Sequence, residues 1–179
     1  MKKLGKIIVA IAIILLVGFL VPYSFENPVE GATKSDYNQK SYWYYPWGTS
    51  ITHKGVDIFK QKNTPIHPAS SVEWVLYAGQ MFGKGGNVVV TLAPRWRIHY
   101  YAHLDKVTAK PLSVVTHQSA IGTVGNTGNA ANTPSHLHFS IASLLPHPWD
   151  MDDSPHGKWK ALYLNPTPYL NSYHEKNPK

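Results

Sequence analysis

The longest apolar stretch of the chain runs without a charged residue from Ile7 to Pro22, directly after Lys2, Lys3 and Lys6. A helix that crosses the hydrocarbon core of a membrane takes roughly 17–25 apolar residues, so this stretch can enter a membrane but is short for a full span. A helix of a globular core would show an amphipathic pattern, which is missing here. We therefore expect an N-terminal membrane helix.

The residues after this helix decide between a cleaved signal peptide and an uncleaved anchor. A signal peptide ends in small residues at alternate positions, whereas Leu20 to Tyr23 are bulky. The sequence thus favours a signal anchor over residues 1–23, with a secreted product as the alternative. In both cases the lysines stay on the cytoplasmic side of the membrane. The remaining chain is exported to the cell envelope, on the outer side of the cytoplasmic membrane.

Beyond the helix, apolar and polar positions alternate over short runs that glycine-rich turns separate. Alternation predicts strands, because successive side chains of a strand point to opposite faces of a sheet. No sustained helical periodicity follows the N-terminal stretch. The pattern therefore predicts an all-β fold of antiparallel sheets. The expected strands are 55–59, 72–77, 88–92, 97–102 and 136–141, with weaker signals at 114–115 and 121.

The same pattern divides the chain into parts. Residues 24–41 are polar and rich in Asn, Pro, Gly and Ser, and we expect a linker there. The aromatic segment 42–48 opens a folded domain, expected at 42–172, where it either seals a sheet or lines a groove. Residues 144–160 form an excursion without a strand pattern, which either walls a groove or packs as a surface loop. Residues 173–179 are expected to be a short tail.

Composition changes this picture in two ways. The 179 residues include no cysteine, which excludes disulfides and thiolate zinc sites, so any metal must be held by histidine and carboxylate. The formal net charge of +7 indicates an acidic polymer or surface as a partner. No run of Lys and Arg alternates with aromatic residues, so nucleic acid is not an expected partner.

Two short patches offer metal ligands. His136 and His138 lie in an expected strand, where side chains two residues apart project from one face, about 7 Å apart. His53 and Asp57 can converge on a metal from a loop and the start of the strand beyond Gly55. Two imidazoles and a carboxylate, with a water, make a catalytic zinc site. The set offers three ligands and leaves histidines over for moving protons.

His103 lies at the end of the expected strand 97–102. Strand alternation predicts that His99, Tyr101 and His103 share one face of the sheet. Taken alone, His103 fits a satisfied core histidine as well as a site residue. The other histidines lack a partner at ligand spacing and are expected on the surface or in loops: His67, His117, His147, His156 and His174.

Four motifs occur in order, namely His53-x-Gly-Val-Asp57-Ile, Tyr101-Ala-His103-Leu, Ile121-Gly-x-Val-Gly-Asn-Thr-Gly128 and His136-Leu-His138-Phe. In this order they resemble the lysostaphin-type zinc metallopeptidases, which cut peptide cross-links in bacterial cell walls. The resemblance spans roughly residues 48–141. It implies an antiparallel β fold with an open groove across the sheet.

The resemblance also implies a role for each site residue. His53, Asp57 and His138 match the Zn2+ ligands, and His103 and His136 match the two catalytic histidines that are not ligands. Zinc lowers the pKa of its bound water, and a neighbouring imidazole can take the proton and pass it to the leaving amine. A second imidazole can stabilise the tetrahedral oxyanion. Which histidine has which role stays open.

The glycines of residues 122–128 are expected to allow positive φ and a close approach of the backbone to substrate. A phosphate-binding loop is excluded, because no Lys-Ser/Thr pair follows and no helix begins there. The chain departs from the family pattern at Ser70-Ser71, at His117-Gln118-Ser119 and at Ser140, none of which is a site residue. These departures bear on loop shape and substrate preference.

Together these observations predict a zinc metalloendopeptidase, a hydrolase that acts on peptidoglycan. Two other functions stay open. One is a non-catalytic wall-binding or regulatory domain of the same fold, although such relatives typically lose a ligand and this chain has lost none. The other is a zinc peptidase that acts on peptides or proteins.

Overall fold

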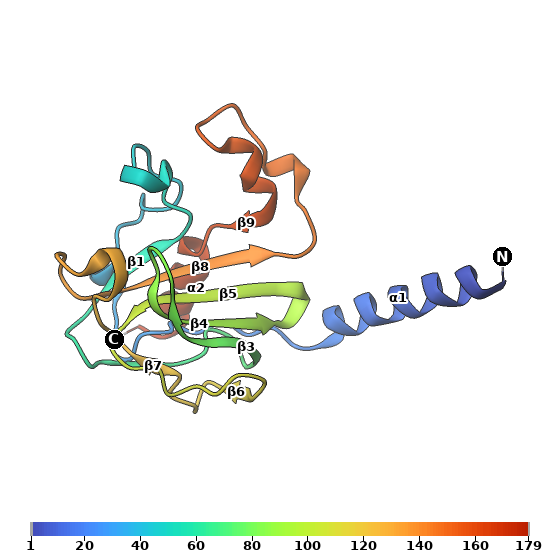
Figure 1. Ribbon diagram of the computed structural model, residues 1–179, viewed down its shortest axis with the longest axis horizontal. Coiled ribbons are helices and arrows are strands. Elements are labelled where there is room, and N and C mark those ends of the chain that lie inside the picture. The colour runs from blue at the N-terminus through green and yellow to red at the C-terminus, as the bar shows by residue number, and fades with distance from the viewer. Residues whose placement is uncertain (1, 179) are drawn as a thin grey trace.

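The computed structural model describes residues 2–178 as a β domain from which one long helix projects (Figure 1). The projecting helix is α1 (Lys2–Leu20), and α2 (Thr167–Lys176) lies near the C-terminus. The strands are β1 (Val56–Phe59), β2 (Pro65–Ile66), β3 (Val72–Met81), β4 (Gly86–Ala93), β5 (Arg97–Leu104), β6 (Val114–Thr116), β7 (Gly122–Thr123), β8 (His136–Ser143) and β9 (Tyr163–Leu164).

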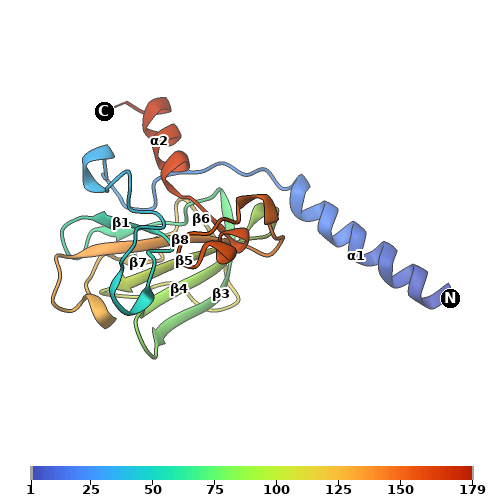
Figure 2. The same cartoon turned by 90° about the horizontal axis from the view of Figure 1, so that it is seen from above.

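Most of the strands belong to one twisted sheet (Figures 1 and 2). This sheet has seven strands in the order β1-β8-β5-β4-β3-β6, with β9 paired to β8, while β2 and β7 form a separate pair. Every pairing is antiparallel. The predicted all-β fold of antiparallel sheets is confirmed, and each of the five expected strands is present.

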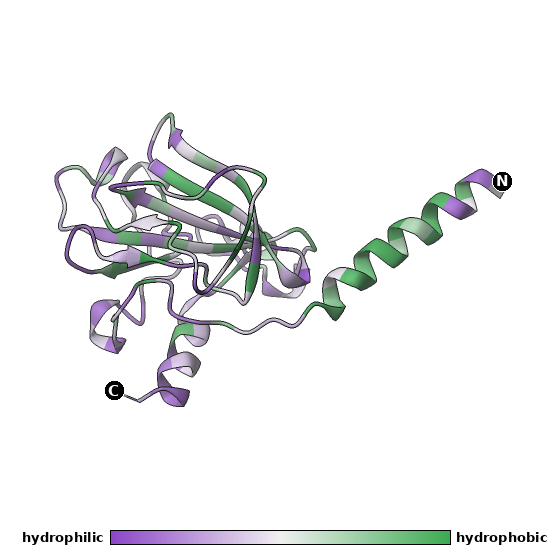
Figure 3. Cartoon of the chain, turned by 90° about the horizontal axis from the view of Figure 1, so that it is seen from below, coloured by the Kyte–Doolittle hydropathy of each residue, from purple (hydrophilic) through white to green (hydrophobic). Residues whose placement is uncertain are grey.

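Helix α1 stands apart from the β domain. It is long and apolar enough to cross a membrane, and no residue of its stretch from Lys3 to Leu20 is buried within the protein. Figure 3 shows apolar residues along most of its length behind a polar first turn. The helix that the sequence predicts is therefore present.

The two faces of the sheet differ because the side chains of each strand alternate. In β8, Leu137, Phe139 and Ile141 are fully buried on the face that packs into the core. His136 and His138 are offset by one residue and project from the opposite face. The core therefore fills one face and leaves the other for chemistry.

Residues 24–41 do not form the free linker that the sequence suggested. Val29, Ala32 and Tyr37 are buried in the main core cluster. Isolated bridges pair Val29 with Ile66 and Tyr37 with Ile58, so the segment lies along the sheet and its edge. Single bridges leave no periodic pattern in a sequence, which is why composition alone indicated a linker.

The C-terminal residues also differ from the expectation. We expected no helix beyond the N-terminus and a tail from 173, but α2 continues to Lys176. Pro168 near the start of α2 suits the first turn of a helix, where a backbone N–H is not needed. Leu170 is fully buried against the core, so α2 is short but held by packing.

A network of buried polar side chains lies on the core face of the sheet around Glu73. The Glu73 carboxylate accepts hydrogen bonds from Tyr101 Oη at 2.9 Å and from Thr91 Oγ1 at 2.5 Å, and it lies 2.7 Å from His99 Nδ1. The Ser70 backbone N–H donates to it at 2.8 Å. Burial by itself raises the pKa of Glu73, but His99 and these donors outweigh it and hold the pKa below its usual value.

We predict that Glu73→Gln lowers the free energy of unfolding by about 3 kcal/mol near neutral pH, because it leaves the partners of a buried charge poorly matched. The native carboxyl has a lowered pKa, so its stabilising effect is present above the usual glutamate pKa and is lost as the pH falls through the native value. The difference between the variant and the wild type should therefore narrow in acid. Urea unfolding of the full chain in detergent, followed by tryptophan fluorescence, measures the loss of unfolding free energy and its dependence on pH.

Glu175→Gln is the matched control, since Glu175 forms an exposed ion pair with Lys34. Such pairs contribute about 0–1 kcal/mol. Equal effects of the two substitutions would contradict the structural role assigned to Glu73.

Candidate functional site

The pairing of β1 with β8 brings two candidate ligands face to face. In this antiparallel register Asp57 lies opposite His138, and Phe59 lies opposite His136. Both pairs project from the face of the sheet that the core leaves free. His53 reaches the same place from the loop before β1, as the sequence predicted for a loop and strand start.

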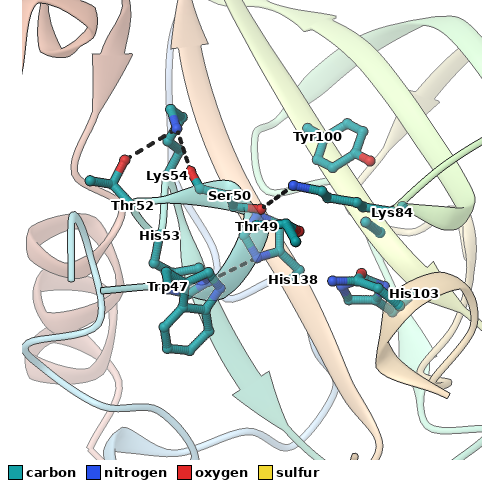
Figure 4. Close-up of a pocket in the computed structure, with 13 residues that line it drawn as sticks. Trp47, Thr49, Ser50, Thr52, His53, Lys54, Lys84, Tyr100, His103 and His138 are labelled. Atoms are coloured by element: carbon teal, nitrogen blue, oxygen red, sulfur yellow. Dashed lines mark hydrogen bonds between the residues drawn. The ribbon is translucent and has the colours of Figure 1, made fainter. Parts of the chain in front are cut away.

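Three ligand atoms converge at this point (Figure 4). His53 Nε2 lies 3.0 Å from Asp57 Oδ1 and 3.0 Å from His138 Nδ1, and His138 Nδ1 lies 2.9 Å from Asp57 Oδ1. Ligands of a tetrahedral zinc ion lie about 2.0–2.2 Å from the metal and hence about 3.4 Å from one another. The observed triangle needs to widen by only a few tenths of an ångström to fit zinc. Two nitrogens and one carboxylate oxygen are also a donor set that zinc binds.

Neighbouring groups fix the orientation of each of these side chains. The Ser41 carbonyl lies 3.0 Å from His53 Nδ1 and can only accept a hydrogen bond, so Nδ1 carries the hydrogen and Nε2 keeps its lone pair. The Trp47 ring stacks on His53 with a centroid distance of 4.2 Å. Gly55 leaves room for His138, because a Cβ there would lie 2.9 Å from its ring and 2.5 Å from the Phe139 carbonyl oxygen.

Burial and neighbouring side chains shift the pKa values of Asp57 and His138. Burial by itself raises the pKa of Asp57, but the neighbouring His138 and His53 rings outweigh burial and hold the pKa far below its usual value. Burial lowers the pKa of His138. A carboxylate and neutral imidazoles are the protonation states in which these residues bind a metal.

His103 reaches the same face through an irregularity in β5. Regular alternation would place it with His99 and Tyr101, as the sequence predicted, and that prediction is wrong. The pairing of β4 with β5 shifts register between Asn87 and Val89, and His103 has a φ of 65°. This β-bulge turns its ring to within 5.1 Å of the His136 ring, between centroids. A non-glycine residue in this conformation costs about 1–2 kcal/mol, which is typical of functional positions.

His103 and His136 present the same nitrogen to the cluster. His103 Nδ1 donates to the Thr127 carbonyl at 2.9 Å, and His136 Nδ1 donates to the Pro134 carbonyl at 2.8 Å. Nε2 of each ring is thereby left as an acceptor, and that of His136 lies 4.0 Å from Asp57 Oδ1. Burial, with the neighbouring His138 and His136, lowers the pKa of His103 to about 4. Two imidazoles whose Nδ1 atoms are bonded to backbone carbonyls therefore flank the ligand triangle.

The glycine loop positions the Thr127 carbonyl that orients His103. A Cβ on Gly125 would lie 2.3 Å from Asp105 N, and one on Gly128, whose φ is 69°, would lie 2.4 Å from Gly86 N. The close approach that these glycines allow is thus to the backbone of the chain itself, at the end of β5 and the β3–β4 turn. The sequence correctly indicated a close backbone approach in this loop, but we expected that approach to be to substrate.

The sequence profile of Peptidase family M23 matches residues 51–150, which include all five candidate site residues. The chain belongs to peptidase family M23. The family comprises metallopeptidases that typically hydrolyse peptidoglycan, and the resemblance to lysostaphin-type enzymes is confirmed.

Individual M23 relatives agree with this assignment. The cell division protein DipM of Caulobacter vibrioides (strain NA1000 / CB15N) is 30% identical over 117 residues, which make up 65% of this chain but only 18% of DipM. The catalytic domain of the antimicrobial peptidase lysostaphin from Staphylococcus simulans has a TM-score of 0.57 and 28% identity, covering 73% of this chain and 89% of that domain. LytU has a TM-score of 0.57 and 23% identity, covering 83% and 91% of the two chains, and shows the shared fold.

In this M23 domain His53 and His138 of the ligand triangle, together with His103, line an open cleft of about 360 Å³. Its lining includes Trp47, from the aromatic segment that the sequence offered as a groove lining, and Lys54, Lys84 and Asn129, to which the sequence assigned no role. Figure 4 shows both lysines beside Ser50, whose carbonyl lies 3.4 Å from Lys54 Nζ and whose hydroxyl lies 3.0 Å from Lys84 Nζ. Burial and the charge of Lys84 lower the pKa of Lys54. Neither lysine forms an ion pair with any residue in the described range 2–178, so the cleft is cationic.

Residues 144–160 support the cleft from outside. Trp43 Nε1 donates to the Pro155 carbonyl at 3.0 Å, and His156 Nδ1 accepts from Lys54 Nζ at 3.0 Å. No residue of 144–160 lines the cleft itself. The excursion therefore holds the aromatic segment 42–48 and Lys54 in place instead of walling the groove.

We predict that Gly55→Ala forces β1 and β8 apart, since the new methyl meets the Phe139 carbonyl and the His138 ring. The free energy of unfolding should fall by about 1–3 kcal/mol, as for other overpacked sites, and the affinity for Zn2+ should fall with it. Urea unfolding and calorimetric zinc titration measure the two effects.

Gly31→Ala is the control, because no atom lies within 4 Å of its Cβ position and its φ is +67°. Gly31→Ala should lower the free energy of unfolding by about 1–2 kcal/mol through backbone strain alone and leave zinc affinity unchanged. Wild-type zinc affinity in Gly55→Ala would show that this glycine does not serve the metal site.

Proposed function

We propose that the protein is a zinc-dependent endopeptidase that hydrolyses peptide cross-links of bacterial peptidoglycan. The observation that carries this proposal is the convergence of His53 Nε2, Asp57 Oδ1 and His138 Nδ1 beside an open cleft that His53 and His138 line, with two further histidines next to them. The cationic lining of the cleft fits an anionic polymer. Membership of the M23 family supports the reaction class.

In this proposal each site residue has a task that its geometry allows. His53, Asp57 and His138 would hold Zn2+, which when bound would supply an activated water and polarise the scissile carbonyl. His103 and His136 turn Nε2 toward the same point, so one accepts the proton of the attacking water and returns it to the leaving amine. The other, once protonated, donates a hydrogen bond to the tetrahedral oxyanion. Trp47 and Tyr100 flank the peptide in the cleft.

We further propose that α1 anchors the enzyme in the cytoplasmic membrane, with the peptidase domain facing outward in the cell envelope. The length and apolar surface of α1 support this, as do the lysines at its N-terminal end, which favour the cytoplasmic side. Cleavage after α1 would instead give a secreted enzyme.

We predict that His138→Ala abolishes both zinc binding and hydrolysis, because two protein ligands remain. His136→Ala should keep one zinc per chain and lose turnover by about 10²–10⁴-fold, the range for removal of a general acid or base. Metal analysis and a peptidoglycan turbidity assay measure the two properties separately. His67→Ala, which alters a histidine 3.5 Å from Glu30 and outside the cleft, should change neither. Retained lytic activity in His138→Ala would refute the metal assignment.

A digest identifies the substrate. We predict that the zinc-loaded protein releases muropeptide fragments from purified peptidoglycan and leaves ordinary peptides intact, as judged by mass analysis of the products. The fragment masses name the bond that is cut. One bound zinc per chain without cleavage of peptidoglycan would indicate a non-catalytic wall-binding domain. Cleavage confined to ordinary peptides would indicate a peptidase with a different substrate.

A further inference from the structure

The chain is fixed to the β domain almost immediately after α1 ends at Leu20. Ser71 Oγ donates to the Pro22 carbonyl at 3.1 Å, and the Arg97 guanidinium lies 4.3 Å from the centroid of the Tyr23 ring. Burial raises the pKa of Tyr23 to about 12. With Val21 and Pro22 alone between the helix and Tyr23, the domain cannot stand more than about 10 Å from the end of α1.

The fixed segment lies at one particular end of the sheet. Tyr23 contacts Arg97, the first residue of β5, and Ser71 immediately precedes β3. Because the strands are antiparallel, the end of β4 and the end of β8 lie at this end too. Figure 1 shows α1 leaving the domain beside the β4–β5 turn. The side chain of Trp96 in that turn donates to the Leu15 carbonyl at 2.9 Å.

The rim around this exit is unusually apolar for a protein surface. Trp74 is 46% exposed, Val114 is 68% exposed and Leu144 is 54% exposed. Val114 and Trp74 pair across β6 and β3, and both line an apolar cavity of about 210 Å³ beside Trp96 and the last turn of α1. We call Trp74, Trp96, Val114 and Leu144 the apolar rim.

Arg95 adds a charge to this surface. It lies in the same turn as Trp96 and is exposed, with its guanidinium 5.6 Å from the centroid of the Tyr23 ring. Tryptophan beside aliphatic residues and arginine is the composition of protein surfaces at the boundary between lipid and water. A patch of this kind directly beside an apolar helix is better matched by a bilayer than by open solvent.

We infer that the apolar rim sits in the headgroup layer of the membrane that α1 crosses, so that the peptidase domain is seated on the bilayer with its cleft held away from the lipid surface. This inference rests on the proposed anchoring by α1. His103 lies six residues beyond Arg97 on β5, which places the cleft about 20 Å from the rim at the rise of a strand. The β3–β4 turn with Phe82 and Lys84 lies at the same far end. The occupant of the rim is thus lipid, and the cleft lies at the end of the sheet that is remote from the bilayer.

The lack of cysteine makes this inference directly testable. Single-cysteine variants Val114→Cys, Phe82→Cys and Ile13→Cys of the full chain are labelled with a polarity-sensitive fluorophore. They are reconstituted into phosphatidylcholine vesicles that contain phosphatidylglycerol and a lipid with a nitroxide near its headgroup. Phe82 is the matched control, since it is fully exposed at the opposite end of the sheet. Ile13 lies within α1 and reports insertion of the helix.

We expect the label at 114 to be blue-shifted and quenched by the nitroxide lipid several-fold more than the label at 82. Equal, weak quenching at 114 and 82 with an inserted label at 13 would overturn the seated domain but leave the anchor standing. A blue shift at 114 without lipid quenching would indicate contact with another copy of the chain and would also overturn it. A label at 13 in water would overturn both. None of these outcomes depends on peptidoglycan hydrolysis, which the digest tests separately.

Discussion

The antiparallel register of β1 against β8 is the constraint on which the site depends. It places Asp57 directly opposite His138 and Phe59 opposite His136, so a carboxylate and an imidazole meet without any loop having to fold over them. A slip of one residue would turn every side chain of one strand to the other face and would bring Leu137 to the cleft. Leu137 and Ile58 pair in the fully buried layer beneath, so the register that fills the core is also the register that assembles the ligands.

The parts that could be predicted from the sequence are those that depend on local alternation. The strands, and the shared face of His136 and His138, follow from the alternation of side chains along a strand. The order of the motifs indicated the family. His103 could not be placed in this way, because its direction depends on a bulge that exists only when β5 pairs with β4. Residues 24–41 and the partnership of Glu73 with His99 likewise depend on contacts between distant segments, which leave no periodic signal along the chain.

The two faces of the sheet surround their buried carboxylates with different partners. On the cleft face, Asp57 is held close to three imidazoles whose free nitrogens converge, which suits a cation. On the core face, Glu73 is fully enclosed and its oxygens are satisfied by donors from β4, β5 and the Ser70 backbone. The Glu73 cluster extends to the segment after α1, because His99 Nε2 lies 3.4 Å from Tyr23 Oη. The segment next to α1 is therefore attached to this buried polar network.

This attachment changes what an anchored peptidase can reach. A free linker over residues 24–41 would let the domain range roughly 20–25 Å from the end of its helix, in any orientation. Packing of Val29 and Tyr37 into the core removes that freedom, so height and orientation are set by the strands themselves. The helix leaves at the start of β5, while His103 near its end and His136 at the start of β8 lie at the opposite end. The polarity of one antiparallel sheet thus separates the end that carries α1 from the end that carries the candidate site, so the proposed anchor would hold the proposed site at a fixed distance from the membrane.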